Sequence, residues 1–222
     1  MSVESSVAHP QPLPTGERVV VLIHGLGANP LMMTLLGMRL MRRGYRIINW
    51  GYWSVGKTIE RHAEAVRRVL DQLESDPRVA EFFLVAHSMG GIVARTAIRE
   101  QKPTKLRRMV MLAPPNRGSH WATWFGPWLR PICTTLDQLA TRPDSYVNQL
   151  PPPHDLEVGI IAAGLDLLVP MAHTHLPTQR DHYVVRMAMH SGVLFRRSVA
   201  EQIDHFLREG TFIRPATASS GT

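Results

Sequence analysis

EFFLVAHSMGGIVAR, residues 81–95, places an apolar run directly before a segment with helical character. Ser88 falls at the junction, so it is predicted to lie in a sharp turn between a buried strand and a helix. Such a turn crowds the positions two before and two after its central residue. These positions hold Ala86 and Gly90, which are small, and Gly91 allows the helix to approach closely. The stretch therefore predicts a strand, a tight turn and a helix in immediate succession.

Similar apolar runs occur on both sides of this stretch and alternate with amphipathic segments. We expect strands at 18–25, 45–50, 81–86, 106–113, 157–164 and 182–188, and helices at 31–43, 58–74, 88–101 and 197–208. The strands are too apolar to face water, which is typical of a parallel sheet covered on both faces. The pattern predicts an α/β fold with a doubly wound, mostly parallel sheet of about six strands.

The chain of 222 residues is long enough to bury a large core in one domain. We expect that domain to span 17–213, with a loose N-terminal arm at 1–16 and a flexible tail at 214–222. The segment 114–153 breaks the alternation and is rich in proline. Because long irregular connections often cover sites, it is predicted to be a lid-like insertion.

Composition limits the partners and the location. The formal charge is +7, but the excess is scattered, which favours a solvated surface, with attraction to anionic membranes as the alternative. The chain lacks a basic run with interleaved aromatics, so we expect no nucleic-acid partner. It also lacks a long uncharged apolar run and a secretory start, and Cys133 is its single cysteine. We therefore expect a cytoplasmic protein, and the sequence leaves its oligomeric state open.

The turn at Ser88 suits a nucleophile. A serine hydroxyl needs a base to take its proton, and the helix N-terminus behind it offers backbone N–H groups to a developing oxyanion. His24-Gly25-Leu26-Gly27 ends the first buried strand, and the carboxyl ends of parallel strands meet at one crevice. We expect the N–H groups of Leu26 and Met89 to form an oxyanion hole and His24 to be structural. The alternative for the second motif is a plain tight turn.

An acid and a base follow from position in the chain. Asp166 lies just past the strand expected at 157–164 and is preferred to four other aspartates, Asp137, Asp144, Asp155 and Asp181. The chain has eleven histidines, and His190 is preferred because it stands between the last strand and the last helix. His87 is expected to point away from the nucleophile. The order Ser88, Asp166, His190 matches the chain order of a triad built on such a turn.

These segments together resemble the α/β-hydrolase fold, from about Arg18 to Phe212. VLIHGLG resembles the oxyanion-loop strand, VAHSMGGIVAR resembles the nucleophile elbow, and MLAPPNRGSHWA resembles the stretch after the next strand in lipases. The resemblance is to small bacterial lipase-like and esterase-like serine hydrolases with a minimal cap. It implies Ser88 as nucleophile, His190 as general base and Asp166 as its orienting partner.

The implied reaction is hydrolysis of a small-molecule ester or lipid through an acyl-enzyme intermediate, with no metal or organic cofactor. A thioesterase, an amidase or an acyltransferase on the same triad is the alternative, because all share the acyl-enzyme step. A non-catalytic binding protein usually lacks a triad member, and all three are present here. His173, His175 and Asp166 are weak evidence for a metal site, because a metal site also needs its ligands held in a rigid geometry.

Four aromatic residues within 114–153 follow the spacing of one helical face, together with Leu129: Trp121, Trp124, Phe125 and Trp128. Gly126-Pro127 interrupts the pattern, which predicts two short helical turns rather than one helix. The aromatic face either packs over the core or forms an acyl-binding wall or lid that contacts lipid. We therefore consider these four residues as candidates for substrate binding.

Overall fold

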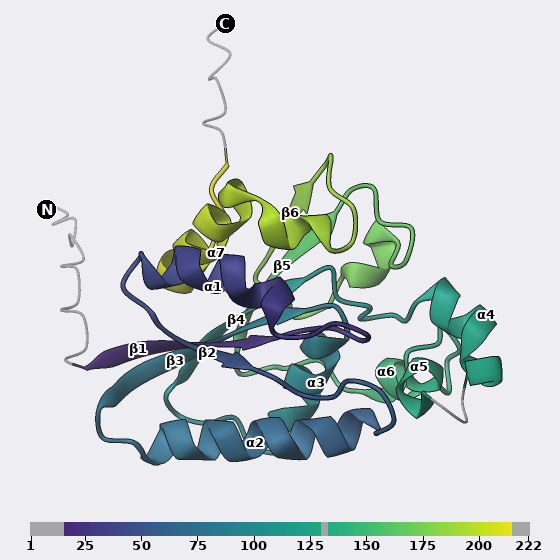
Figure 1. Ribbon diagram of the computed structural model, residues 1–222, viewed down its shortest axis with the longest axis horizontal. Helices are drawn as coiled ribbons and strands as arrows, with labels where there is room; N and C mark the ends of the chain where they lie inside the picture. The colour runs from purple at the N-terminus through teal and green to yellow at the C-terminus, as the bar shows by residue number, and fades with distance from the viewer. Residues whose placement is uncertain (1–15, 130–132, 215–222) are drawn as a thin grey trace, which may run out of the picture.

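The computed structural model describes residues 16–129 and 133–214, which form a six-stranded, fully parallel sheet (Figure 1). Its strands are β1 (Glu17–Ile23), β2 (Arg46–Trp50), β3 (Val79–His87), β4 (Leu106–Leu112), β5 (Glu157–Ala163) and β6 (Asp181–Val185). The predicted α/β fold is confirmed. The arm and the tail predicted at the chain ends fall outside the described residues, apart from Gly16 and Arg214.

The strand order β2-β1-β3-β4-β5-β6 determines where a site can form. The chain winds outward from β1 to β2 and then crosses back to β3 on the other side of β1. The direction of winding therefore reverses between β1 and β3, and a crevice opens at the carboxyl ends of these two strands. This reversal places the loop after β1 beside the turn after β3.

Helices cover both faces of the sheet (Figure 1). α1 (Leu31–Met41) and α7 (Arg197–Glu209) pack on one face, and α2 (Ile59–Ser75) and α3 (Met89–Ala97) pack on the other. The amphipathic stripe expected on α2 is buried, and its N-terminus is capped by Thr58, whose side chain accepts the Arg61 N–H at 3.4 Å. α7 ends at Gly210, whose φ of 77° is the left-handed conformation that glycine adopts readily.

Two elements were predicted to extend three or four residues beyond the ends that the structure shows. α3 ends at Ala97 instead of Gln101, because Pro103 disfavours a helical residue before it and the chain must turn into β4. β6 ends at Val185 instead of Ala188, because the Ala188 N–H donates to the Val185 carbonyl and closes a turn. Both corrections concern the ends of elements and leave the topology unchanged.

The described part of the segment 114–153, which leaves out 130–132, contains three helices: α4 (His120–Leu129), α5 (Thr134–Gln138) and α6 (Tyr146–Gln149). The prediction of two short turns around Gly126-Pro127 was wrong, since α4 runs through Pro127. Packing explains the difference. A Cβ on Gly126 would lie 3.2 Å from the Asp137 Cα, so the glycine lets α4 sit directly on α5. Contact with α5 thus stabilises a helix that local propensity disfavours.

Arg95 of α3 is buried and holds both ends of this segment. Its guanidinium donates to Asn116 Oδ1 at 2.9 Å, to the Leu150 carbonyl at 2.8 Å and to the Pro151 carbonyl at 3.2 Å. Burial lowers the pKa of Arg95 to about 10, so it remains protonated at neutral pH. One cationic side chain therefore joins the start and the end of 114–153 to the central helix.

Among the helices of residues 16–129 and 133–214, none has the length and apolar character that crossing a bilayer requires.

Candidate active site

Ser88 stands between β3 and α3 in a strained conformation. Its φ of 52° and ψ of −127° are unusual for a residue with a side chain. The turn is possible because the two residues that approach it most tightly, Gly90 and Gly25, have no side chains. A Cβ on Gly90 would lie 2.5 Å from the Ile23 carbonyl oxygen, and one on Gly25 would lie 2.9 Å from the Ser88 Cβ. The crowded turn therefore places the Ser88 hydroxyl at the carboxyl edge of the sheet, beside the loop after β1.

The structure brings Asp166 and His190 to this serine. His190 Nε2 lies 2.9 Å from Ser88 Oγ, and His190 Nδ1 lies 2.7 Å from Asp166 Oδ2. Asp166 follows β5 and His190 follows β6, so the carboxyl ends of β3, β5 and β6 supply the three side chains, although 102 residues separate Ser88 from His190. The arrangement can move a proton from the Ser88 hydroxyl to the imidazole.

The Asp166 carboxylate is held rigidly. Its side chain is only 1% exposed, and its Oδ1 accepts the N–H groups of Leu168 and Val169, both at 2.9 Å. These two bonds leave Oδ2 directed at His190. A buried carboxylate with both oxygens engaged can orient the imidazole and stabilise its protonated form.

The two N–H groups expected to form an oxyanion hole remain free of protein acceptors among the described residues. Leu26 lines the same cavity as Ser88, and Met89 is the first residue of α3. The next N–H, that of Gly27, donates instead to the Ser54 side chain at 3.0 Å. Leu26 therefore lines the cavity with an N–H that has no protein acceptor among the described residues, while the next N–H is anchored.

The loop after β2 supports this loop from outside the cavity. The Tyr52 hydroxyl donates to the His24 carbonyl at 2.8 Å, and the Tyr52 ring stacks on the His24 ring with centroids 4.3 Å apart. His24 is fully buried, and that burial lowers its pKa. His24 thus lies beneath the loop, as the sequence predicted. The supports Tyr52 and Ser54 were missed, because nothing in the local sequence indicates which loop they contact.

His87 does not point away from the nucleophile, and that prediction was wrong. Its ring lies 4.9 Å from the His190 ring, and its Nε2 lies 3.2 Å from the His190 carbonyl oxygen. The strained backbone at Ser88 breaks the alternation of a strand, so consecutive side chains face the same cavity. Burial, and next the charge on His190, lowers the pKa of His87 to about 3. His87 is therefore a neutral neighbour of His190 near pH 7.

A cavity of about 360 Å³ lies over Ser88. Its apolar wall comes from several elements: Met32, Pro115, Trp121, Ala122, Leu136, Leu139, Leu168 and Val169. Of the four aromatic candidates, only Trp121 lines it. Trp124, Phe125 and Trp128 are exposed and lie outside, because α4 extends away from the cavity after its first turn. The structure thus brings one candidate, and not the other three, to the site.

A sequence model described as "Alpha/beta hydrolase family" matches residues 20–210. The chain belongs to the alpha/beta hydrolase family. The resemblance noted in the sequence is thereby confirmed, and the parallel sheet described above is the expected core of such a protein. Among curated proteins, none matches this chain in sequence.

Several solved structures share the fold of this α/β hydrolase. The mature lipase BlEst2 of Bacillus licheniformis has a TM-score of 0.66 at 14% identity, covering 91% of this chain and 94% of that chain. A lipase-esterase related protein from Clostridium acetobutylicum has a TM-score of 0.60 at 16% identity, with coverages of 87% and 98%. The esterase Pf2001 of Pyrococcus furiosus has a TM-score of 0.60 at 14% identity, with coverages of 86% and 83%. At these identities the similarity establishes the fold.

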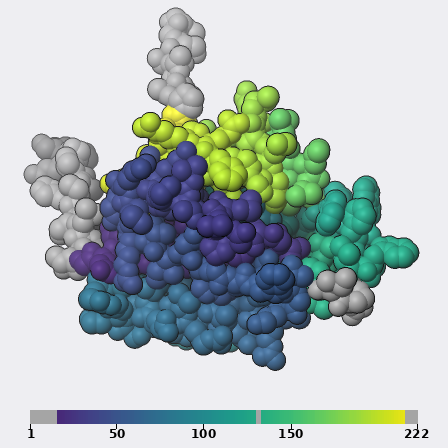
Figure 2. Space-filling model, in the orientation of Figure 1, coloured from purple at the N-terminus to yellow at the C-terminus, as the bar shows by residue number. Residues whose placement is uncertain are grey.

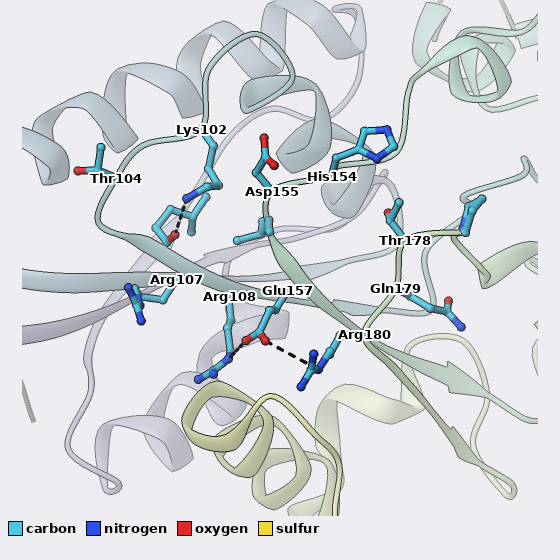
Figure 3. Close-up of a pocket in the computed structure, with 13 residues that line it drawn as sticks. Lys102, Thr104, Arg107, Arg108, His154, Asp155, Glu157, Thr178, Gln179 and Arg180 are labelled. Carbon is cyan, nitrogen blue, oxygen red and sulfur yellow. Dashed lines mark hydrogen bonds and ion pairs between the residues drawn. The ribbon is translucent and has the colours of Figure 1, made fainter. Parts of the chain in front are cut away.

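A second cavity of the α/β hydrolase, about 710 Å³, lies at the opposite edge of the sheet, by the amino ends of β4 and β5 (Figure 3). Charged side chains line it, four bases and two acids, and two of the bases share one acid. Glu157 lies 2.5 Å from Arg108 and 3.8 Å from Arg180. This cavity is larger than the one over Ser88. The Thr104 hydroxyl in its lining donates to Glu74, and no lining hydroxyl is hydrogen-bonded to a histidine among the described residues, so we do not assign chemistry to it.

The residues weighed as metal ligands do not gather. His173 Nδ1 lies 2.9 Å from the Gly118 carbonyl oxygen, and His175 stacks on His182 with ring centroids 4.0 Å apart. Asp166 is engaged with His190. Within residues 16–129 and 133–214, no group of three or more His, Cys, Asp or Glu side chains is placed to hold a metal ion.

Proposed function

We propose that this α/β hydrolase is a serine hydrolase that cleaves carboxylic esters through an acyl-enzyme intermediate. The observation that carries the proposal is the continuous chain of short contacts from Ser88 Oγ through His190 to the buried carboxylate of Asp166. The Ser88 end of this series of contacts lies in an apolar cavity, beside two unpaired backbone N–H groups. A nucleophile, a base and an oxyanion site are the three requirements of acyl transfer.

The reaction has two halves. In the first, His190 takes the Ser88 proton as Oγ attacks the ester carbonyl, and the oxyanion accepts hydrogen bonds from the Leu26 and Met89 N–H groups. His190 then gives its proton to the departing alcohol, which leaves an ester between Ser88 and the acyl group. In the second half, His190 takes a proton from water as the water attacks this ester. It then gives that proton to Ser88 Oγ as the bond between Oγ and the acyl carbon breaks, which releases the acid and free Ser88. Asp166 keeps the imidazole in the tautomer that both halves need.

One observation favours ester hydrolysis over the cleavage of thioesters or amides, and over acyl transfer to acceptors other than water. The structures that share the fold at high coverage include proteins described as a lipase, a lipase-esterase related protein and an esterase. The triad itself would serve all of these acyl donors. A panel of p-nitrophenyl esters, matching thioesters and anilides separates them by kcat/KM.

The proposal is tested with a fluorophosphonate probe and intact-mass measurement on wild type and on Ser88→Ala. We expect one covalent adduct on wild type and none on the variant, because only an activated serine attacks the phosphorus centre. Circular dichroism would verify that both proteins are folded. An unlabelled, well-folded wild type would overturn the proposal, and equal labelling of both proteins would place the reactive residue elsewhere.

The position of Trp121 predicts a preference for acyl chain length. Trp121→Ala removes part of the cavity wall, so we expect kcat/KM for a p-nitrophenyl octanoate to fall about tenfold, which corresponds to about 1.4 kcal/mol of lost apolar contact. For the acetate ester we expect a change of less than about twofold, since a short acyl group does not need that wall.

Trp124→Ala is the matched control on the same helix, because Trp124 is 71% exposed and lies outside the cavity. It should leave kcat/KM unchanged for both soluble esters. Equal losses on acetate and octanoate in Trp121→Ala would contradict an acyl-binding role for this residue.

A further inference from the structure

Five segments surround the opening of the cavity over Ser88: 24–30, 51–58, 113–129, 164–176 and 186–196. Each follows the carboxyl end of a strand, namely β1, β2, β4, β5 and β6. We call these segments the rim. Because parallel strands end at one edge of the sheet, the rim forms one face of the molecule, opposite the cavity of Figure 3.

The rim is strongly apolar. Of the sixteen large apolar side chains that are exposed among the described residues, twelve belong to it: Trp53, Trp121, Trp124, Phe125, Trp128, Leu165, Leu167, Leu168, Met171, Met187, Met189 and Phe195. Scattered exposed apolar residues are ordinary, but a group of this size on one face indicates an interaction site. Four of the twelve are more than 70% exposed: Trp53 at 79%, Trp124 at 71%, Trp128 at 84% and Leu167 at 94%.

α4 carries two exposed tryptophans, Trp124 and Trp128, away from the body of the protein. Figure 1 places α4 beyond the ends of the strands, and Figure 2 shows this region, in teal, projecting from the right side of the molecule. Tryptophan combines a large apolar ring with a polar N–H, which suits the boundary between lipid headgroups and acyl chains. The projection therefore lets Trp124 and Trp128 reach a flat surface before the rest of the rim does.

The exposed Lys, Arg, Asp and Glu side chains of the rim are all basic. Its sequence holds four bases, Lys57, Arg117, Arg186 and Arg196, all exposed, and one acid, Asp166. Asp166 is 1% exposed and paired with His190, so it presents no charge to the outside. Beyond the rim, Asp137 and Asp144 of the 133–145 segment both pair with Arg142. The five rim segments are thus apolar and basic and contain no exposed acid, although the 133–145 segment beside them carries the exposed Asp144.

We propose that the rim docks on an anionic phospholipid surface, with the α4 tryptophans at headgroup level and the cavity opening toward the lipid. Exposed bases attract anionic headgroups, and the apolar side chains gain from leaving water. A second copy of this chain fits less well, since two such faces would bring bases against bases. The docking proposal depends on the proposed function in one respect: the purpose of docking is to present lipid esters to Ser88.

The test uses the full chain with Ser88→Ala, so that hydrolysis cannot alter the lipid. Binding is measured by co-sedimentation with vesicles of pure phosphatidylcholine and with vesicles of equal phosphatidylcholine and phosphatidylglycerol. We expect at least tenfold tighter binding to the anionic vesicles. Tryptophan fluorescence should also be quenched by lipids brominated near the headgroup, since Trp124 and Trp128 would contact them.

Two pairs of variants separate the rim from the rest of the surface. Arg117→Gln with Arg186→Gln should weaken binding to the anionic vesicles by about 25-fold, at roughly fivefold for each base. Arg42→Gln with Arg68→Gln removes the same charge from α1 and α2 and should change it less than twofold. Trp124→Ala with Trp128→Ala should weaken binding at least tenfold, whereas Met41→Ala with Ile213→Ala, two exposed apolar residues away from the rim, should not.

The proposal is overturned if neither kind of vesicle binds, or if rim and control variants weaken binding equally. It is also overturned if the rim variants instead abolish a dimer seen by sedimentation velocity, because the face would then join two copies. Circular dichroism melts show whether each variant is folded. If the protein does not bind vesicles but wild type is labelled by the fluorophosphonate, the docking proposal fails and the proposed function stands. If the protein binds vesicles but wild type is not labelled, the proposed function fails and the docking proposal stands.

Discussion

His190→Ala should lower kcat/KM for a soluble short-chain ester by on the order of 10⁵-fold, close to the loss expected for removing the whole triad. Among residues 16–129 and 133–214, His190 is the only group within 3 Å of Ser88 Oγ that can take its proton, and it also delivers the proton to the leaving alcohol. Initial rates with p-nitrophenyl acetate, corrected for the rate in buffer, measure the effect. Fluorophosphonate labelling of Ser88 should slow in parallel.

The other histidines provide the controls. His205→Gln, on the exposed surface of α7, should keep kcat/KM within about twofold of wild type, because its Nδ1 contacts only the Thr211 carbonyl at 2.7 Å. A loss below tenfold in His190→Ala would show that another base serves Ser88. His87 would be the first to examine, since its ring is adjacent to that of His190.

Arg95→Ala should lower the free energy of unfolding by about 3–5 kcal/mol. The change leaves two buried acceptors, Asn116 Oδ1 and the Leu150 carbonyl, without this donor, and each unpaired buried acceptor costs about 1–3 kcal/mol. Relief from burying a guanidinium offsets part of this loss, because no carboxylate pairs with Arg95 among the described residues. Urea denaturation followed by circular dichroism measures it.

Two further variants separate the contributions. Arg95→Met keeps most of the buried stem and removes only the donors, so its loss should be smaller, about 2 kcal/mol. Arg99→Ala, just after the same helix, removes an exposed arginine that pairs with exposed Glu100 and should cost less than about 0.5 kcal/mol. Equal losses for Arg95→Ala and Arg99→Ala would show that the buried bonds to Asn116, Leu150 and Pro151 do not hold the segment.

The sequence alone determined the topology and the three side chains that meet at the strand ends. Apolar runs identified the buried strands, and small residues around Ser88 identified a turn that few sequences can form. Asp166 and His190 were found because each directly follows a strand, and strands of a parallel sheet all end at one edge. These inferences succeeded because their causes lie within a few residues in the chain.

The tertiary structure decided what depends on contacts between distant segments. α4 continues through Pro127 because Gly126 packs on α5, and His87 faces the cavity because the backbone at Ser88 is strained. Trp121, rather than its three aromatic neighbours, lines the cavity because of the direction in which α4 leaves it. Neither propensity nor periodicity carries this information, since packing between elements sets the direction of each side chain after the local structure has formed.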